Sequence, residues 1–162
     1  DLDSISNQGL EFVEDNKIKV IKYPIKKNKT DTELAIDHLI ENNIKYITLT
    51  GVTGSRLDHS LTNIHLLKML ADKEVQAKIV NDNNTLWYVS DRVSIKRRDG
   101  YYISIIPLTL NGIIVTLKGF LYPLTKTLIQ FGSSLAISNE IVDLFGEITI
   151  HKGQALIIES KD

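Results

Sequence analysis

The spacing of the apolar residues changes from a helical to an extended period part-way along the chain, and this change limits the possible folds more than any other feature. Before about residue 75, apolar residues recur every three or four positions, as on one face of a helix. The clearest such run consists of Leu57, Leu61, Ile64 and Leu67. Later, apolar and polar residues alternate, as around Val115, which is typical of a strand with one buried face. We therefore expect an α/β domain over residues 1–75 and an antiparallel β-sandwich over residues 76–162.

Strand-like and helix-like segments alternate in the first part of the chain. Residues 19–23 and 44–50 have the β-branched composition of short strands, whereas residues 31–43 and 57–71 have helical spacing. Thr30 and Glu33 match a capping box at the start of the first of these helices. This strand–helix order predicts a parallel sheet.

Turn signals separate the strands expected in the second part. Asp99-Gly100 and Asn111-Gly112 are typical of β-hairpins, because both residue types tolerate the positive φ of a type I′ turn. Lys152-Gly153 is a weaker third signal. Several short strands joined by such turns predict a sandwich or barrel.

The composition excludes several classes of protein. The chain has 162 residues, of which 19 are basic and 20 acidic, and this balance argues against a general nucleic-acid binder. It has no cysteine, which excludes disulfides, thiolate zinc sites and a cysteine nucleophile and fits a cytoplasmic location. No apolar run approaches the roughly 20 residues of a membrane span. The four histidines lack the i, i+4 spacing of a helical zinc pair.

Two acidic elements in the first part could hold a cation or a phosphate. Asp1 and Asp3 point the same way if the segment is extended, and hard cations such as Mg²⁺ prefer such carboxylates. The alternative is a solvated polar terminus. Asp31 lies between Thr30 and Thr32 at a predicted helix N-terminus, where either an ordinary cap or an anion site is expected. The abrupt start at Asp1 suggests that the sequence is a fragment.

A glycine-containing loop is expected between the strand at 44–50 and the helix at 57–71. Gly51 and Gly54 permit close backbone approach, and successive N–H groups can surround a phosphate. Arg56 could add a bidentate phosphate contact, and Asp58 could orient a metal-bound water or a substrate group. The segment matches neither a Walker A loop nor the Rossmann glycine pattern. An ordinary strand-to-helix loop is the alternative.

Ser138 and Asn139 form a fourth candidate. Their side chains offer donors and acceptors that suit the edge of a heterocycle. A turn that uses Ser and Asn for its own hydrogen bonds is the default explanation.

Together these elements resemble the thiamine pyrophosphokinase family, nearly from end to end. The resemblance rests on the order and spacing of short motifs: D-x-D-S at 1–4, T-D-T-E at 30–33, G-x-x-G-x-R-x-D-H at 51–59 followed by Asn63, G-F-L-Y-P-L at 119–124, I-S-N-E at 137–140 and the closing segment 153–160. It implies a nucleotide-binding α/β domain before a thiamine-binding sandwich, in a homodimer. The implied reaction moves the pyrophosphoryl group of ATP to the hydroxyl of thiamine and requires Mg²⁺.

The resemblance also implies roles for individual residues. Mg²⁺ would be held by Asp1, Asp3 and Asp31. Catalysis would depend on Asp31, Arg56 and Asp58, with either aspartate as the possible base. The ATP contacts would come from Thr30, Thr32, Gly51, Thr53, Gly54, Arg56 and His59. Ser138 and Asn139 would contact the thiamine pyrimidine across the dimer interface.

One departure from the family pattern leaves two alternatives open. Members of the family normally carry a glycine and a strand–helix–strand segment before the D-x-D element, and the sequence begins after that point. A Mg²⁺-dependent nucleotide hydrolase would release AMP without thiamine. A non-catalytic dimeric sandwich would bind a ligand without turnover.

Overall fold

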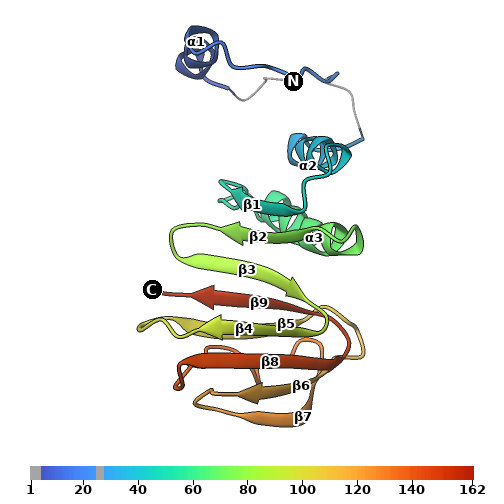
Figure 1. The fold of residues 1–162 in the computed structure, drawn as a ribbon, viewed down its shortest axis with the longest axis vertical. Coiled ribbons are helices and arrows are strands. Elements are labelled where there is room, and N and C mark those ends of the chain that lie inside the picture. The colour runs from blue at the N-terminus through green and yellow to red at the C-terminus, as the bar shows by residue number, and fades with distance from the viewer. Residues whose placement is uncertain (1–4, 25–27) are drawn as a thin grey trace. The chain divides into compact units, whose positions relative to one another are not determined.

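The structure is a computed structural model that describes residues 5–24 and 28–162 (Figure 1). The chain divides into two compact units, residues 1–42 and residues 43–162, which we describe separately. In the described residues, no helix is both long and apolar enough to cross a membrane.

The first unit contains two helices, α1 (Asn7–Asp15) and α2 (Asp31–Glu41). Helix α2 confirms the helix predicted there, and the Thr30 hydroxyl caps it by accepting a 3.2 Å hydrogen bond from the backbone N–H of Glu33. The other half of the capping box differs, because the Glu33 carboxylate forms an ion pair with Lys29.

One sequence expectation for this unit was wrong, and one of its helices was not predicted. Residues 19–23 form no strand, although their composition is β-branched; a strand needs a hydrogen-bonded neighbour, and this segment has none in the described chain. Helix α1 was not predicted. Its local signal is Ser6, whose hydroxyl accepts a hydrogen bond from the backbone N–H of Gly9 at 3.1 Å.

The second unit contains a five-stranded mixed sheet in the order β1-β2-β3-β9-β5. The strands are β1 (Tyr46–Thr50), β2 (Gln76–Val80), β3 (Asn84–Val89), β9 (Ala155–Ser160) and β5 (Tyr102–Pro107). The predicted parallel pairing occurs between β1 and β2, which helix α3 (Leu57–Asp72) connects; the remaining neighbours are antiparallel.

Helix α3 begins as predicted, but its buried face differs from its apolar run. Leu67 is buried, whereas Leu57 and Leu61 are 72% and 55% exposed. Ser60 and Asn63 are buried in their place. Polar residues therefore occupy the inner face of the first turns of α3.

A four-stranded antiparallel sheet completes the second unit, in the order β4-β8-β6-β7. Its strands are β4 (Arg92–Lys96), β8 (Phe145–Lys152), β6 (Ile113–Lys118) and β7 (Leu124–Ile129). One apolar core joins buried residues of both sheets, including Ile103, Ile105, Ile113, Val115, Ile148 and Ile157. A β-rich second part is thus confirmed, with the alternating residues pointing inward as expected.

The three predicted turns exist, but none of them makes a hairpin. Asp99-Gly100 joins β4 to β5, Asn111-Gly112 joins β5 to β6, and Lys152-Gly153 joins β8 to β9, so each connection passes from one sheet to the other. All three glycines have positive φ. At Gly153 an added Cβ would lie 2.8 Å from the backbone oxygen of Gly112, so the corner also requires close backbone approach.

The five-stranded sheet contains strands from both sides of residue 75. Strand β1 precedes that residue, and β2, β3, β9 and β5 follow it. The strand order thus does not mark a boundary between residues 75 and 76, and the domain division there stays a prediction.

Candidate active site

The loop at residues 51–56 joins the carboxyl end of β1 to the N-terminus of α3, as the sequence predicts. Gly51 has a φ of +69°, a conformation that residues with a Cβ rarely adopt. Nothing lies within 4 Å of the position that a Cβ would take at Gly51 or Gly54. The backbone of this loop is therefore accessible to a ligand at both glycines.

Two buried side chains of α3 hold this loop in place. The Ser60 hydroxyl accepts a hydrogen bond from the backbone N–H of Gly54 at 3.0 Å and lies 3.0 Å from the carbonyl oxygen of Arg56, to which it can donate. The Asn63 amide donates to the carbonyl oxygen of Val52 at 2.7 Å. Both side chains are more than nine-tenths buried, so water competes little for these hydrogen bonds. They therefore hold the backbone of the loop in one conformation without a ligand.

A third contact ties the loop to the neighbouring strand. The Asn81 amide, directly after β2, donates a 3.0 Å hydrogen bond to the hydroxyl of Thr53. Since β1 and β2 are parallel, their carboxyl ends meet at one edge of the sheet, the usual position of a ligand site in open α/β sheets.

Arg56 and Asp58 form an ion pair where the loop at 51–56 meets the N-terminus of α3. The guanidinium donates from Nε to Oδ1 at 3.2 Å and from Nη2 to Oδ2 at 2.6 Å. Both side chains are well exposed, at 70% and 65%. The hydrogen bonds from Arg56 and the backbone of His59 lower the pKa of Asp58 to about 2, so this carboxylate is ionised at neutral pH. The exposed His59 follows it in the first turn of α3.

Of the predicted acidic site residues, only Asp31 lies in the described part of the first unit, at the start of α2. Asp31 is the exposed first residue of α2, and the half-buried Thr32 follows it. Beside them, Lys29 Nζ lies 2.6 Å from Asp37 Oδ2, and this contact raises the pKa of Lys29. Asp1 and Asp3 lie outside the described residues. Within the described parts of the chain, no three Asp, Glu or His side chains gather as metal ligands.

Ser138 and Asn139 are neighbours in the segment between β7 and β8, but their environments differ. Asn139 is 4% exposed, and its amide oxygen accepts from the backbone N–H groups of Tyr122 and Glu140 while its nitrogen donates to the carbonyl oxygen of Tyr122. Ser138 is exposed, with a φ of +56°, and its hydroxyl makes no hydrogen bond within the described chain. Asn139 therefore organises this segment, and Ser138 presents an open hydroxyl.

The loop at 51–56 and the segment around Asn139 lie at opposite edges of the five-stranded sheet. A single row of paired residues crosses it: Thr50, Val80, Thr85, Glu159, Ile103 and Asn139. Five strand spacings of about 4.8 Å separate the ends of this row, or roughly 24 Å. The structure thus brings Gly51, Thr53, Gly54, Arg56, Asp58 and His59 together, but it does not bring Ser138 or Asn139 to them.

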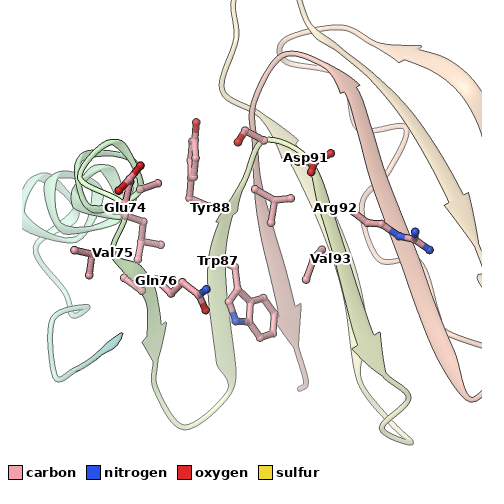
Figure 2. Close-up of a pocket in the computed structure, with 13 residues that line it drawn as sticks. Glu74, Val75, Gln76, Trp87, Tyr88, Asp91, Arg92 and Val93 are labelled. Carbon is pink, nitrogen blue, oxygen red and sulfur yellow. The ribbon is translucent and has the colours of Figure 1, made fainter. Parts of the chain in front are cut away.

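A separate hollow of about 540 Å³ lies at the other end of β2. Figure 2 shows Glu74 and Gln76 on one side of Tyr88 and Trp87, and Asp91, Arg92 and Val93 on the opposite side. Because Gln76 begins β2 and the loop at 51–56 lies beside its carboxyl end, this hollow is not part of the site described above.

Comparison with known proteins assigns these elements. Residues 1–79 match the model of the thiamin pyrophosphokinase catalytic domain, and residues 91–155 match the thiamin pyrophosphokinase vitamin B1 binding domain. The thiamine pyrophosphokinase of Bacillus subtilis (strain 168) is 33% identical over 164 residues, an alignment that covers 100% of this chain and 77% of the relative. The chain belongs to the thiamine pyrophosphokinase family.

Solved structures support the same assignment. The thiamine pyrophosphokinase of Bacillus subtilis superposes with a TM-score of 0.91 at 33% identity, covering 100% of this chain and 77% of that one. The thiamin pyrophosphokinase of Geobacillus thermodenitrificans gives 0.86 at 34% identity, covering 100% and 75%. The resemblance seen in the sequence motifs is therefore confirmed.

Sequence reasoning missed two residues that build the loop. Ser60 lies on the inner face of α3, and its signal was a polar residue within a helical apolar pattern. Asn81 carried a turn signal in the run N-D-N-N at 81–84, but nothing in the sequence indicated its contact with Thr53.

Proposed function

We propose that this chain transfers the pyrophosphoryl group of ATP to the hydroxyl of thiamine, giving thiamine diphosphate and AMP. The thiamine oxygen forms a bond to the β-phosphorus, the bond from that phosphorus to the oxygen shared with the α-phosphorus breaks, and the hydroxyl proton passes to a base. The observation that carries the proposal is the prepositioned loop at 51–56, in a chain whose two parts match the family's catalytic and vitamin-binding domains.

The loop and the start of α3 supply the groups that phosphate binding needs. The helix N-terminus and the open backbone at Gly51 and Gly54 suit anionic oxygens. Arg56 is exposed, so its guanidinium can turn from Asp58 to a phosphate. The resemblance to the family also implies ATP contacts from Thr53 and His59 and from Thr30 and Thr32.

The base that accepts the hydroxyl proton would be Asp31 or Asp58, and the ion pair with Arg56 weighs against Asp58 while that pair is intact. A base with a pKa of about 2 accepts a proton poorly at neutral pH. We assign Asp58 the role of holding Arg56 before ATP binds and of positioning the reacting groups once Arg56 has turned to the phosphate.

Mg²⁺ fits the chemistry of the acidic residues, since carboxylate oxygens are its preferred protein ligands. Asp1, Asp3 and Asp31 would hold it. When bound, the ion would neutralise the charge of the phosphates, the main requirement of phosphoryl transfer.

The separation across the five-stranded sheet supports a homodimeric site. Roughly 24 Å between the phosphate loop and Asn139 exceeds the length of a thiamine molecule. Ser138 of one copy would therefore meet the loop at 51–56 of another, with Asn139 shaping the thiamine-binding segment. In this arrangement residues 1–75 act as a parallel-sheet nucleotide-binding domain and residues 76–162 as a thiamine-binding sandwich, in the cytoplasm.

The test measures AMP and thiamine diphosphate formed from ATP and Mg²⁺ by the full-length protein, with and without thiamine. Equal amounts of the two products, formed only with thiamine, are expected. Arg56→Gln should lower kcat/KM by about 10²–10³ through loss of a transition-state contact. The control is Arg97→Gln, because Arg97 forms a similar exposed pair with Asp99 away from the loop.

Two outcomes would overturn the proposal. AMP release that does not need thiamine would indicate a nucleotide hydrolase. Binding of thiamine without any turnover of ATP would indicate a non-catalytic module.

A further inference from the structure

The outward face of the four-stranded sheet contains a hollow of about 320 Å³ that the proposed reaction does not use. Its lining comes from all four strands: Arg92, Thr116, Lys118, Thr125, Lys126, Glu147, Thr149 and His151. The apolar residues that alternate with them, such as Val115, Leu117 and Ile148, are buried in the core on the other side of the sheet. No residue of the loop at 51–56 or of the segment 138–139 lines it.

An irregularity in strand pairing adds a side chain to this hollow. Val115 pairs with Thr127 and Leu117 with Leu124, so Thr125 and Lys126 both lie opposite Thr116. Such a bulge places two side chains where regular pairing places one. The backbone N–H of Lys126 donates to the Thr116 hydroxyl at 3.0 Å, which holds the bulge in place.

Lys126 adopts a strained conformation in this bulge. Its φ is +46°, in the left-handed region that favours glycine. Residues held in this region are concentrated at ligand sites, where the surrounding structure maintains the strain. Glycine would adopt this conformation without strain, but the chain has a lysine here, and its ammonium group lines the hollow.

The charge of the hollow is locally basic although the whole chain carries a formal charge of −1. Arg92, Lys118 and Lys126 share it with a single carboxylate, Glu147, which forms a 2.6 Å ion pair with Arg92. In the described part of the chain, neither Lys118 nor Lys126 forms an ion pair.

Hydroxyl and imidazole groups lie between the cations. Thr116 pairs with Thr149 across β6 and β8, and Thr149 pairs with Arg92 across β8 and β4. The Thr116 hydroxyl lies 2.8 Å from Nε2 of His151. Hydroxyl, imidazole and cationic side chains thus line the hollow together, and this is the chemistry that binds phosphate oxygens.

We propose that this hollow binds a small molecule through a phosphate or diphosphate group, with Lys118 and Lys126 as the main charge contacts. The group is either a free inorganic anion or part of a larger diphosphate ester. The site is separate from the proposed nucleotide loop, and its existence does not depend on the proposed reaction.

The test titrates inorganic pyrophosphate into the protein while following the His151 imidazole signal by NMR and the affinity by calorimetry. The first protein is an Arg56→Gln variant, in which pyrophosphate binding at the loop is weakened. We expect the His151 signal to shift, and the double substitution Lys118→Gln with Lys126→Gln to weaken binding at least tenfold. The matched control is Lys96→Gln, because Lys96 is exposed on β4 of the same sheet but does not line the hollow.

Two further ligands sharpen the result. If thiamine diphosphate saturates the shift of the His151 signal at a lower concentration than pyrophosphate does, the ligand is a diphosphate ester; saturation at a higher concentration identifies the inorganic anion. An unshifted His151 signal, equal affinity in the double variant and the Lys96→Gln control, or an equal response to citrate would each overturn the proposal. Melting temperatures matched to the parent protein would show that the variants are folded.

Discussion

Replacing Asn139 by alanine tests whether this side chain organises the thiamine-binding segment or contacts thiamine itself. The substitution removes three hydrogen bonds, two from the backbone N–H groups of Tyr122 and Glu140 and one to the carbonyl oxygen of Tyr122. Each contributes about 1 kcal/mol to the free energy of unfolding, and the freed backbone groups lie near the surface, where water can replace part of the loss. We expect a total loss of about 2–3 kcal/mol. For a protein of this size that lowers the melting temperature by about 4–12 °C.

The assay is urea denaturation of Asn139→Ala beside Ser138→Ala, with the KM for thiamine measured for both. Ser138→Ala should change stability by less than about 0.5 kcal/mol, because its exposed hydroxyl makes no hydrogen bond in the described chain. It should raise the KM for thiamine. The reasoning is refuted if Asn139→Ala costs less than 1 kcal/mol and raises the KM, since Asn139 would then act on the ligand.

Three further predictions follow from charge and backbone conformation. Arg98→Met leaves the carboxylate of Glu159, which is 5% exposed, without its 2.8 Å partner, and should lower the free energy of unfolding by about 2–3 kcal/mol; urea denaturation showing under 1 kcal/mol would contradict this. Arg56→Gln should return the pKa of Asp58 from about 2 toward 3.8, as measured by carboxyl NMR titration. In the parent protein, the stabilisation from this ion pair is present above about pH 4 and is lost as the pH falls toward 2. An unchanged pKa would show that the backbone of His59 controls it. Lys126→Gly should raise stability by up to about 1 kcal/mol by relieving the positive φ, and a lower melting temperature would contradict this strain.

Features that depend on nearby residues were predictable from the sequence. The Thr30 cap, helix α2, helix α3 and the inward-pointing alternation of β6 and β8 all follow from interactions within a few residues. The loop at 51–56 was equally predictable, since glycine spacing between a strand and a helix is a local signal. The sequence motifs also indicated the family correctly.

Features that depend on distant partners were not predictable. Residues 19–23 have strand composition but no strand to pair with. The turn at Asp99-Gly100 has hairpin chemistry, yet its flanking strands pair in different sheets, because each buries its apolar face against the common core. Glycine conformation specifies that the chain turns, and the packing of the two sheets decides where it goes.

For the site residues too, some properties follow from the local sequence and others depend on contacts with distant segments. The sequence by itself determined that Arg56 and Asp58 stand at a helix start and that Ser138 and Asn139 are adjacent. Only the tertiary structure decided that the Asn139 amide is used within the chain, that Ser60 and Asn63 hold the loop, and that roughly 24 Å separates the two groups. The physical reason is that hydrogen-bond partners and strand order are set by contacts between segments far apart in the chain, such as β5 with the segment around Asn139, and residue type alone does not encode them.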